Sequence, residues 1–307
     1  MYGAIIVAAG KEKKPNQFNP LLKFGNITVI ERIVATLKSA KIEQIVIVTG
    51  NNAKELEKKL KHYGVIFLRN DEYLTTQMFD SAKIGFAYLK GKCQKIIFTP
   101  ANLPLYTKKT VEKLLASNSD VAYPLYQGRR GHPVCFQEKL LDQIMQYTGN
   151  QGLRGALHHF DKIEEIDVDD QGIVYNDTSS LKQQKLLQIH NHQMYRSLID
   201  VMIVKENLII NHEIAQLLHL IEMMGSISDA SSKMNMSYSK CLKLIKQLEN
   251  QIQKPIVIRK QGGLQGGYAY LSDDGKELLK RFLQFENKLV EIAEQLFVEE
   301  FSDFLGS

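Results

Sequence analysis

Near the start of the chain stands the segment Ala4-Ile5-Ile6-Val7-Ala8-Ala9-Gly10. Its first four residues are apolar and mostly β-branched, which predicts a short strand buried on both faces, as in a parallel sheet. The small residues Ala8, Ala9 and Gly10 follow directly, and small side chains let backbone N–H groups approach a phosphate closely. In open parallel sheets, ligands bind at the carboxyl ends of the strands. The segment therefore predicts an α/β fold with an anion-binding loop after its first strand.

Strand and helix patterns alternate as far as residue 99. Strands are expected at 4–7, 44–49, 65–68 and 95–99, and helices at 29–39, 53–62 and 76–89. Such a succession predicts a doubly wound, mostly parallel sheet covered by helices. We assign residues 1–190 to this first domain, which is an ordinary size for one folding unit.

The loop after the first strand continues as Lys11-Glu12-Lys13-Lys14-Pro15-Asn16-Gln17-Phe18-Asn19-Pro20-Leu21-Leu22-Lys23. Together with Ala8-Ala9-Gly10, it resembles the phosphate-gripping loop of the molybdenum cofactor nucleotidyltransferases of the MobA and MocA type. That signature has Ala-Ala-Gly, two small residues, an arginine, and a lysine just before a proline-leucine segment. Here Lys14 stands for the arginine and Asn19 for the lysine. The resemblance implies a fold like that of the nucleotide-diphospho-sugar transferases.

Both replacements fall on residues that handle charge. Lys14 stays positive but lacks the forked guanidinium that matches a phosphate. Asn19 cannot neutralise a leaving pyrophosphate, and losing one such contact costs about 2.7 to 4 kcal/mol of transition-state stabilisation. Lys11, Lys13 or Lys23 can compensate, and a basic surface loop without a ligand is the alternative interpretation. The candidate nucleotide-binding residues are Ala8, Ala9, Gly10, Lys14, Lys23 and Ser81, the last within a segment that contacts the nucleotide in relatives.

A second loop, Phe98-Thr99-Pro100-Ala101-Asn102-Leu103-Pro104-Leu105, follows the strand expected at 95–99. In the family that it resembles, an aspartate before the apolar-proline pair coordinates the magnesium ion that bridges the nucleotide phosphates. Asn102 occupies this position, and a neutral amide is a poor ligand for a hard cation that prefers carboxylates. Asp177 stands near a position where relatives place a second acidic group, or it caps a helix that begins near Ser179. We therefore expect Mg²⁺ only if nucleotidyltransferase activity persists.

Two further segments match the family, Gly128-Arg129-Arg130-Gly131-His132-Pro133 and Gly152-Leu153-Arg154-Gly155-Ala156-Leu157. In relatives the first of them faces the cofactor half of the site. Guanidinium forks suit phosphates and pterin-like groups. The candidate anion-binding residues are Arg129, Arg130, His132 and Arg154, although a lone histidine is more often packed or at the surface than catalytic.

From Leu208 onward the pattern becomes almost wholly helical, with one glycine-rich interruption, and residues 191–207 are interpreted as a linker. The junction contains His190-Asn191-His192. These histidines are close enough to suggest a metal site, but no cysteine or further ligand accompanies them. We therefore favour solvated linker residues.

The segment that begins Gly225-Ser226-Ile227-Ser228-Asp229 is typical of a helix-turn-helix. Ser228 can cap a short helix, a tight turn follows at 234–236, and Ser237 can cap a longer helix that runs to about Gln251. Between Ser226 and Lys260, seven basic residues face two acidic ones, as on a surface that contacts phosphates. The candidate DNA-binding residues are Ser237, Tyr238, Ser239, Lys240, Lys243, Lys246, Arg259 and Lys260.

Two strands, at 255–259 and 268–271, are expected around a glycine-rich tip at 260–267, and Ser272 is expected to cap a long helix from Asp273 to about Phe297. This pattern resembles the winged helix-turn-helix domain of the molybdate-responsive ModE-type regulators, which are related to the LysR type. In relatives the long helix pairs two subunits, so the resemblance implies a homodimer; an intramolecular core face is the alternative. We assign residues 208–307 to this mainly α domain.

The composition is that of an ordinary globular protein. The chain has 307 residues, a net charge of +5 and 44% hydrophobic residues, without an apolar run long enough to span a membrane. No signal peptide is expected, because Met1-Tyr2-Gly3 leads straight into the first strand. Three widely separated cysteines indicate reduced thiols. These features predict a cytoplasmic protein.

Two functions remain open. The first is a DNA-binding transcriptional regulator of molybdenum cofactor or molybdoenzyme metabolism, whose degenerate nucleotidyltransferase-like domain senses CTP, GTP, molybdopterin or a related anion. The alternative is a bifunctional enzyme that transfers CMP or GMP from CTP or GTP to molybdopterin. We favour the regulator because the changes at Lys14, Asn19 and Asn102 all alter charge-handling positions.

Overall fold

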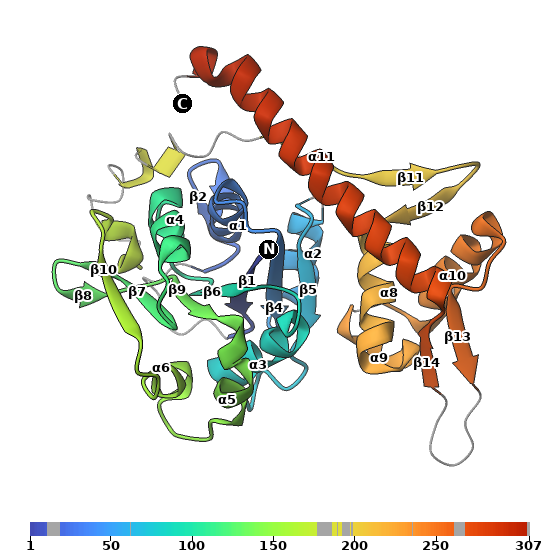
Figure 1. The fold of residues 1–307 in the computed structure, drawn as a ribbon, viewed down its shortest axis with the longest axis horizontal. Coiled ribbons are helices and arrows are strands. Elements are labelled where there is room, and N and C mark those ends of the chain that lie inside the picture. Colours follow the sequence, from blue (N-terminus) through green and yellow to red (C-terminus); the bar gives the residue numbers. More distant parts are fainter. Residues whose placement is uncertain are drawn as a thin grey trace. The chain divides into compact units, whose positions relative to one another are not determined.

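The structure is a computed structural model, and it describes residues 1–10, 19–61, 63–176, 186–188, 190–191, 197, 199–234, 236–260 and 268–305. The chain forms two compact units (Figure 1). The first contains Met1–Lys61, Val65–Arg196 and Ser302–Ser307, and the second contains His62–Gly64 and Ser197–Phe301.

The first unit is built on a mixed, mostly parallel sheet with the strand order β10-β7-β9-β6-β1-β4-β5, and β8 pairs with β7. Four neighbouring strands, β5, β4, β1 and β6, run parallel. Strand β9 is antiparallel to both β6 and β7. The strands of this sheet are β1 (Tyr2–Ala8), β4 (Gln44–Thr49), β5 (Ile66–Arg69), β6 (Lys95–Pro100), β7 (Val121–Tyr126), β8 (Arg129–Arg130), β9 (Val134–Gln137) and β10 (Ile163–Asp167).

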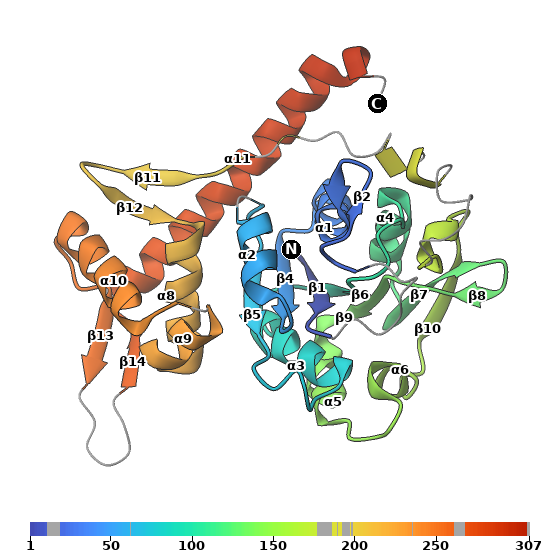
Figure 2. The same ribbon diagram turned by 180° about the vertical axis from the view of Figure 1, so that it is seen from behind.

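Helices cover both faces of this sheet (Figures 1 and 2). On one face α1 (Val29–Ser39) packs against α4 (Lys108–Ala116), and on the other α3 (Met78–Leu89) packs against α5 (Leu141–Gln146) and α6 (Gly152–Leu157). Strand β1 is buried from Gly3 to Ala8, as the apolar run predicted for a central parallel strand. The doubly wound α/β prediction is confirmed. The described part of the unit also contains α2 (Ala53–Leu60), the short pair β2 (Lys23–Phe24) and β3 (Ile27–Thr28), and the 3₁₀ turns η1 (Glu138–Leu140) and η2 (Gln171–Ile173).

The second unit begins with a hairpin of β11 (Met202–Val204) and β12 (Leu208–Asn211). The prediction of a linker up to residue 207 and of helices from Leu208 was wrong at this point. Two short apolar runs flank the polar residues Lys205-Glu206-Asn207, which is a hairpin pattern. The unit also contains α8 (His212–Met224), α9 (Ile227–Lys233), α10 (Tyr238–Ile252), the antiparallel pair β13 (Val257–Lys260) and β14 (Tyr268–Leu271), and α11 (Asp273–Leu305) as far as Phe301.

Serine side chains cap three helices of this unit. The Oγ atoms of Ser237 and Ser272 accept hydrogen bonds from Lys240 N and Gly275 N, at 3.2 and 3.0 Å, as expected. Helix α9 is capped by Ser226, which accepts from the backbone N–H of Asp229, and not by Ser228 as predicted. The helix begins earlier because Ile227 is buried in its first turn. Helix α11 extends to Leu305, beyond the expected end at Phe297.

Among the described residues, no helix combines the length and the apolar character that a bilayer span requires.

Candidate functional site

The loops after three parallel strands are tied together at the carboxyl edge of the sheet. The backbone N–H of Ala101, after β6, donates to Val7 O at 3.1 Å, and that of Asn51, after β4, donates to Ala9 O at 3.3 Å. A Cβ on Gly50 would lie 2.7 Å from both Ala9 O and Tyr73 Cβ, so this close approach requires glycine. Parallel strands thus bring the predicted phosphate loop next to the loops after β4 and β6.

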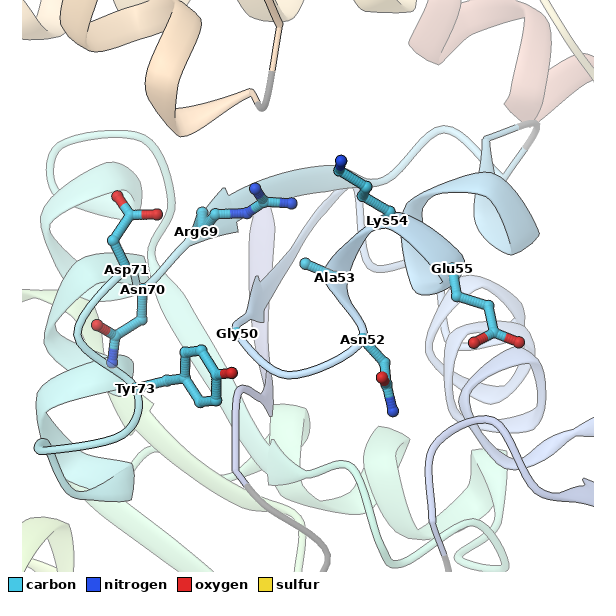
Figure 3. Close-up of a pocket in the computed structure, with 9 residues that line it drawn as sticks. All are labelled: Gly50, Asn52, Ala53, Lys54, Glu55, Arg69, Asn70, Asp71 and Tyr73. Atoms are coloured by element: carbon cyan, nitrogen blue, oxygen red, sulfur yellow. The ribbon is translucent and has the colours of Figure 1, made fainter.

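A pocket of about 440 Å³ opens at the ends of β4 and β5 (Figure 3). Its lining combines an aromatic ring, neutral amides and charges of both signs. In Figure 3 the side chains of Arg69 and Lys54 lie along one rim, and the ring of Tyr73 lies beside Gly50. Arg69 Nη2 is 3.4 Å from Glu57 Oε1. The lining residues are Gly50, Asn52, Ala53, Lys54, Glu55, Arg69, Asn70, Asp71 and Tyr73.

A buried amide holds the loop that carries Tyr73. Asn70 Nδ2 donates to Thr76 Oγ1 at 2.8 Å and to Ser81 Oγ at 2.9 Å, and Asn70 Oδ1 accepts from Glu72 N. Asn70 and Ser81 are both buried. Ser81 was proposed to contact a nucleotide, which stays a prediction, and the structure shows its hydroxyl supporting the pocket loop. Sequence reasoning missed the pocket itself, although the glycine directly after β4 was an available signal.

The predicted phosphate loop is described at its two ends. Ala8 and Ala9 are buried and Gly10 is exposed, whereas Lys14 lies outside the described residues. Asn19 Oδ1 accepts from Leu21 N at 2.9 Å, and the Asn19 carbonyl accepts from Leu22 N. The Asn19 side chain, at the position where the resemblance implies a lysine, therefore shapes a turn.

Lys23, the last candidate in this segment, is exposed on β2. Its ammonium group is thus accessible from solvent, and the nucleotide-binding role proposed for it stays a prediction.

Asn102 was predicted to stand where relatives hold a metal ion, and this stays a prediction. Its Oδ1 is buried and has no hydrogen-bond partner among the residues that the structure describes. A single neutral amide oxygen is not the donor set of a Mg²⁺ site. In the part of the chain that the structure describes, no three His, Cys, Asp or Glu side chains group closely enough to hold a metal ion; Asp177 lies outside that part. The described residues therefore do not fit magnesium.

The predicted anion-binding residues lie on β8, on the following loop and on α6. Arg129 and Arg154 are exposed. Arg130 forms an ion pair with Glu165, and its guanidinium lies 4.8 Å from the centre of the Tyr123 ring.

His132 follows β8. Burial lowers its pKa to about 4, which leaves the imidazole neutral at physiological pH, and its Nδ1 is buried without a partner among the described residues. A neutral imidazole has one N–H donor and one acceptor nitrogen, and it carries no charge for an anion.

His190 was interpreted as a solvated linker residue, and this was wrong. It is 2% exposed, with Nε2 3.0 Å from Thr36 Oγ1 and Nδ1 3.4 Å from Arg32 Nη1. Arg32 Nη1 also donates to Asn191 Oδ1 at 2.8 Å. Burial and the neighbouring guanidinium lower the pKa of His190 to about 3. The charge of Arg32 within the apolar run of α1 was the available sequence signal.

Basic residues line the exposed side of α10. Cys241, Ile245 and Leu248 are buried, at the spacing of one helix face. Leu242, the neighbour of Cys241, is half-buried. The exposed residues are Ser237, Tyr238, Ser239, Lys240, Lys243 and Lys246.

Part of this charge is already compensated. Lys240 pairs with Glu213 at 2.9 Å, and Arg259 on β13 pairs with Glu249 at 3.7 Å. Lys243 and Lys246 form no ion pair with a described residue, and they can therefore meet an external anion. Lys260 is the last residue of β13, and its side chain lies outside the part of the chain that the structure describes.

Comparison with known proteins identifies the first unit. The MobA-like NTP transferase domain model matches residues 4–165. The bifunctional protein GlmU of Clostridium tetani is 28% identical over 114 residues, which is 36% of this chain and 25% of that protein. GlmU of Francisella tularensis subsp. novicida is 27% identical over 118 residues, 38% of this chain and 25% of that protein. The chain thus spans about a quarter of the length of these curated relatives.

Among solved structures, a nucleotidyl transferase from Methanothermobacter thermautotroptrophicus superimposes with a TM-score of 0.51 at 19% identity. The superposition covers 62% of this chain and 97% of the nucleotidyl transferase chain. This likeness shows the fold of the first unit.

Proposed function

Because the chain belongs to the MobA-like NTP transferase domain family, we propose that its first unit binds a nucleotide or a related anion as a sensor, and that its second unit binds DNA as a winged helix-turn-helix. The protein is then a transcriptional regulator of molybdenum cofactor or molybdoenzyme metabolism. One observation carries this proposal: the same chain has a neutral side chain, Asn102, at the carboxyl edge of its sheet and an exposed basic helix, α10, in its second unit.

The ligand half of the proposal rests on the carboxyl edge of the sheet. Gly50 lets the loop after β4 lie directly against Ala9 O and Tyr73 Cβ, so the first-strand loop and the pocket loop are held together at this edge. The pocket beside them offers the Tyr73 ring for stacking and the Arg69 and Lys54 charges for an anionic group. CTP, GTP and molybdopterin each combine a ring system with phosphate, and so each matches this lining.

The sensor role rests on what the site lacks for catalysis. Nucleotidyl transfer places negative charge on a pyrophosphate, and a metal ion or cation normally stabilises that charge. Asn102 supplies a neutral amide at the metal position, and the Asn19 amide is engaged in a turn. A site of this kind binds a ligand and does not turn it over.

The DNA half rests on the order and exposure of the elements in the second unit. Helix α9 is followed by a short turn, the Ser237-capped helix α10, the hairpin β13–β14 and a long helix, an order that resembles the ModE-type domain. Helix α10 exposes Lys243 and Lys246, which suits contact with phosphates.

We propose that the protein forms a homodimer. Helix α11 exposes Phe285, Ile292 and Leu296, with half-buried Leu289 between them. Their spacing of four, three and four residues is that of a coiled-coil seam. A second copy of α11 is therefore the proposed partner, and it would present two α10 helices to two half-sites.

Two measurements on the full chain test this function. The melting temperature is recorded with CTP, GTP or molybdopterin, each with Mg²⁺ or with EDTA, since a ligand that binds only the folded state raises it. Binding to promoter DNA is followed by fluorescence anisotropy for the wild type, for Lys243→Ala/Lys246→Ala, and for Lys280→Ala, an exposed lysine of α11, as control.

We expect the ligand to raise the melting temperature in EDTA as well as in Mg²⁺. We also expect DNA binding that weakens as the salt concentration rises and that is reduced only in the double variant. Pyrophosphate release that requires Mg²⁺ would support the nucleotidyltransferase alternative instead. Absence of binding to every promoter fragment would reject the regulator.

A further inference from the structure

The hairpin β13–β14 exposes two tyrosines on one face. Alternate residues of a strand point to opposite faces. On β14, Ala269 and Leu271 are buried, whereas Tyr268 and Tyr270 are 49% and 38% exposed. In the strand register, Tyr268 is opposite Lys260 and Tyr270 is opposite Ile258. The hairpin thus has a packed face and an aromatic face turned to solvent.

The two rings form one preorganised surface. Their centroids are 5.9 Å apart and their planes differ by 17°, so the rings are stacked. A tyrosine side chain has only two rotatable angles, and fixing it costs little conformational entropy on binding. Each ring presents an apolar body and a hydroxyl that can donate or accept a hydrogen bond.

The charge around this face favours a polyanion. From Ser226 to Lys260, seven basic residues face two acidic ones, and no acidic residue occurs between Asn250 and Ser272. Arg259 is opposite Ala269 in the strand register, in the set of positions that alternates with the two tyrosines, and it pairs with Glu249 on α10. Lys254 pairs with Asp274. Lys260 shares the register position of Tyr268. A basic or apolar protein partner would match this charge less well than nucleic acid.

We propose that Tyr268 and Tyr270 form a contact surface for the sugar–phosphate backbone of double-stranded DNA. The proposal rests on the DNA-binding function proposed for the second unit and adds the residues through which the hairpin takes part. The phenolic hydroxyls donate to phosphate oxygens, as tyrosines do in protein–DNA complexes. The ring bodies cover the apolar edges of the deoxyriboses. Such contacts position the protein without reading the base sequence.

Because backbone contacts do not depend on sequence, the test uses the full-length protein and a labelled random-sequence duplex. The dissociation constant is measured by fluorescence anisotropy at several salt concentrations. The variants are Tyr268→Ala/Tyr270→Ala, which removes rings and hydroxyls, and Tyr268→Phe/Tyr270→Phe, which removes only the hydroxyls. Tyr126→Ala, in the first unit, is the control for loss of a tyrosine, and Lys243→Ala is the control for loss of a cation. Circular dichroism and melting temperatures verify that each variant folds.

We expect the alanine variant to bind about tenfold more weakly at every salt concentration, and the phenylalanine variant about threefold more weakly. Neither should change the slope of binding against salt, because no cation is removed, whereas Lys243→Ala should reduce that slope by about one. Tyr126→Ala should bind as the wild type does.

Equal binding by the wild type and the alanine variant would overturn the tyrosine surface and leave the DNA-binding function intact. Absence of wild-type binding to any duplex would instead reject that function, and the tyrosine surface with it. A loss confined to single-stranded DNA would assign the rings to base stacking and so contradict a duplex contact.

Discussion

Arg32 Nη1 lies 3.4 Å from His190 Nδ1, and each residue is only 2% exposed. Burial lowers the pKa of Arg32 to about 10, so the guanidinium remains charged at neutral pH. Its Nε donates to Phe24 O at 2.7 Å, and its Nη1 to Asn191 Oδ1. Arg32 therefore joins α1 to two segments, the strand that follows the predicted phosphate loop and residues 190–191.

Replacing Arg32 should destabilise the first unit. Arg32→Met preserves much of the side-chain volume but leaves the buried carbonyl oxygen of Phe24 without this donor, and it removes the hydrogen bond to Oδ1 of the exposed Asn191. An unsatisfied buried polar group costs about 1 to 3 kcal/mol, so we expect a loss of about 2 kcal/mol in the free energy of unfolding. Urea denaturation measures the loss. Arg129→Met, at an exposed position, should change stability by less than about 0.5 kcal/mol, and equal stability of both variants would contradict the bridging role.

Acidification should destabilise the protein through His132 and His190. The pKa values of His132 and His190 are lowered to about 4 and about 3 from an ordinary value near 6.5. The unfolded chain therefore binds more protons below pH 6.5, and the stability conferred by the neutral rings is complete above that pH and lost as the pH falls towards 4 and 3.

Between pH 7 and 5, each histidine should account for a loss of about 2 kcal/mol. The measurement is the free energy of unfolding at both pH values for the wild type, His132→Gln and His190→Gln. Between pH 7 and pH 5, each of these two variants should lose less free energy of unfolding than the wild type. His158→Gln, at an exposed site, is the control, and an unchanged pH dependence in all three variants would contradict the assignment.

Local patterns predicted much of the first unit, because its elements depend on near neighbours. Helix α1 and strand β4 have the expected bounds, since the Thr28 cap and the buried apolar run are both local features. His190 was misassigned because Arg32 lies 158 positions away in the sequence. The pocket at Gly50 and Tyr73 was missed for a similar reason, since two loops form it only when β4 and β5 pair.

Gly50 should tolerate no side chain. In Gly50→Ala the added Cβ would meet Ala9 O and Tyr73 Cβ at 2.7 Å, which forces the two loops apart. We expect a loss of about 1 to 3 kcal/mol of stability and a smaller ligand-induced rise in melting temperature. Gly10→Ala is the matched change, because a Cβ at Gly10 meets no atom of a described residue within 4 Å. If both variants were equally stable, the packing of these loops would not be what requires glycine at residue 50.

The seam on α11 should control assembly. Ile292→Lys/Leu296→Lys places two charges on the proposed coiled-coil interface, where burial without a partner is costly. We expect the double variant to be monomeric in sedimentation analysis at concentrations where the wild type is dimeric. Lys288→Ala, an exposed residue of the same helix, should leave assembly unchanged. A dimeric double variant would place the subunit contact elsewhere.

Restoring a carboxylate at residue 102 should give the site an affinity for magnesium. Asn102 Oδ1 is buried without a hydrogen-bond partner in the described part of the chain, and Asn102→Asp replaces the amide by a nearly isosteric carboxylate that hard divalent cations prefer. We expect Mg²⁺ to increase the ligand-induced rise in melting temperature of the variant by several degrees and to leave that of the wild type unchanged. Asn70→Asp, at a buried amide whose donors are already used by Thr76 and Ser81, should lower stability without creating magnesium dependence. A wild type that already requires Mg²⁺ for ligand binding would show that residues other than Asn102 hold the ion, and the sensor interpretation would then give way to the enzyme.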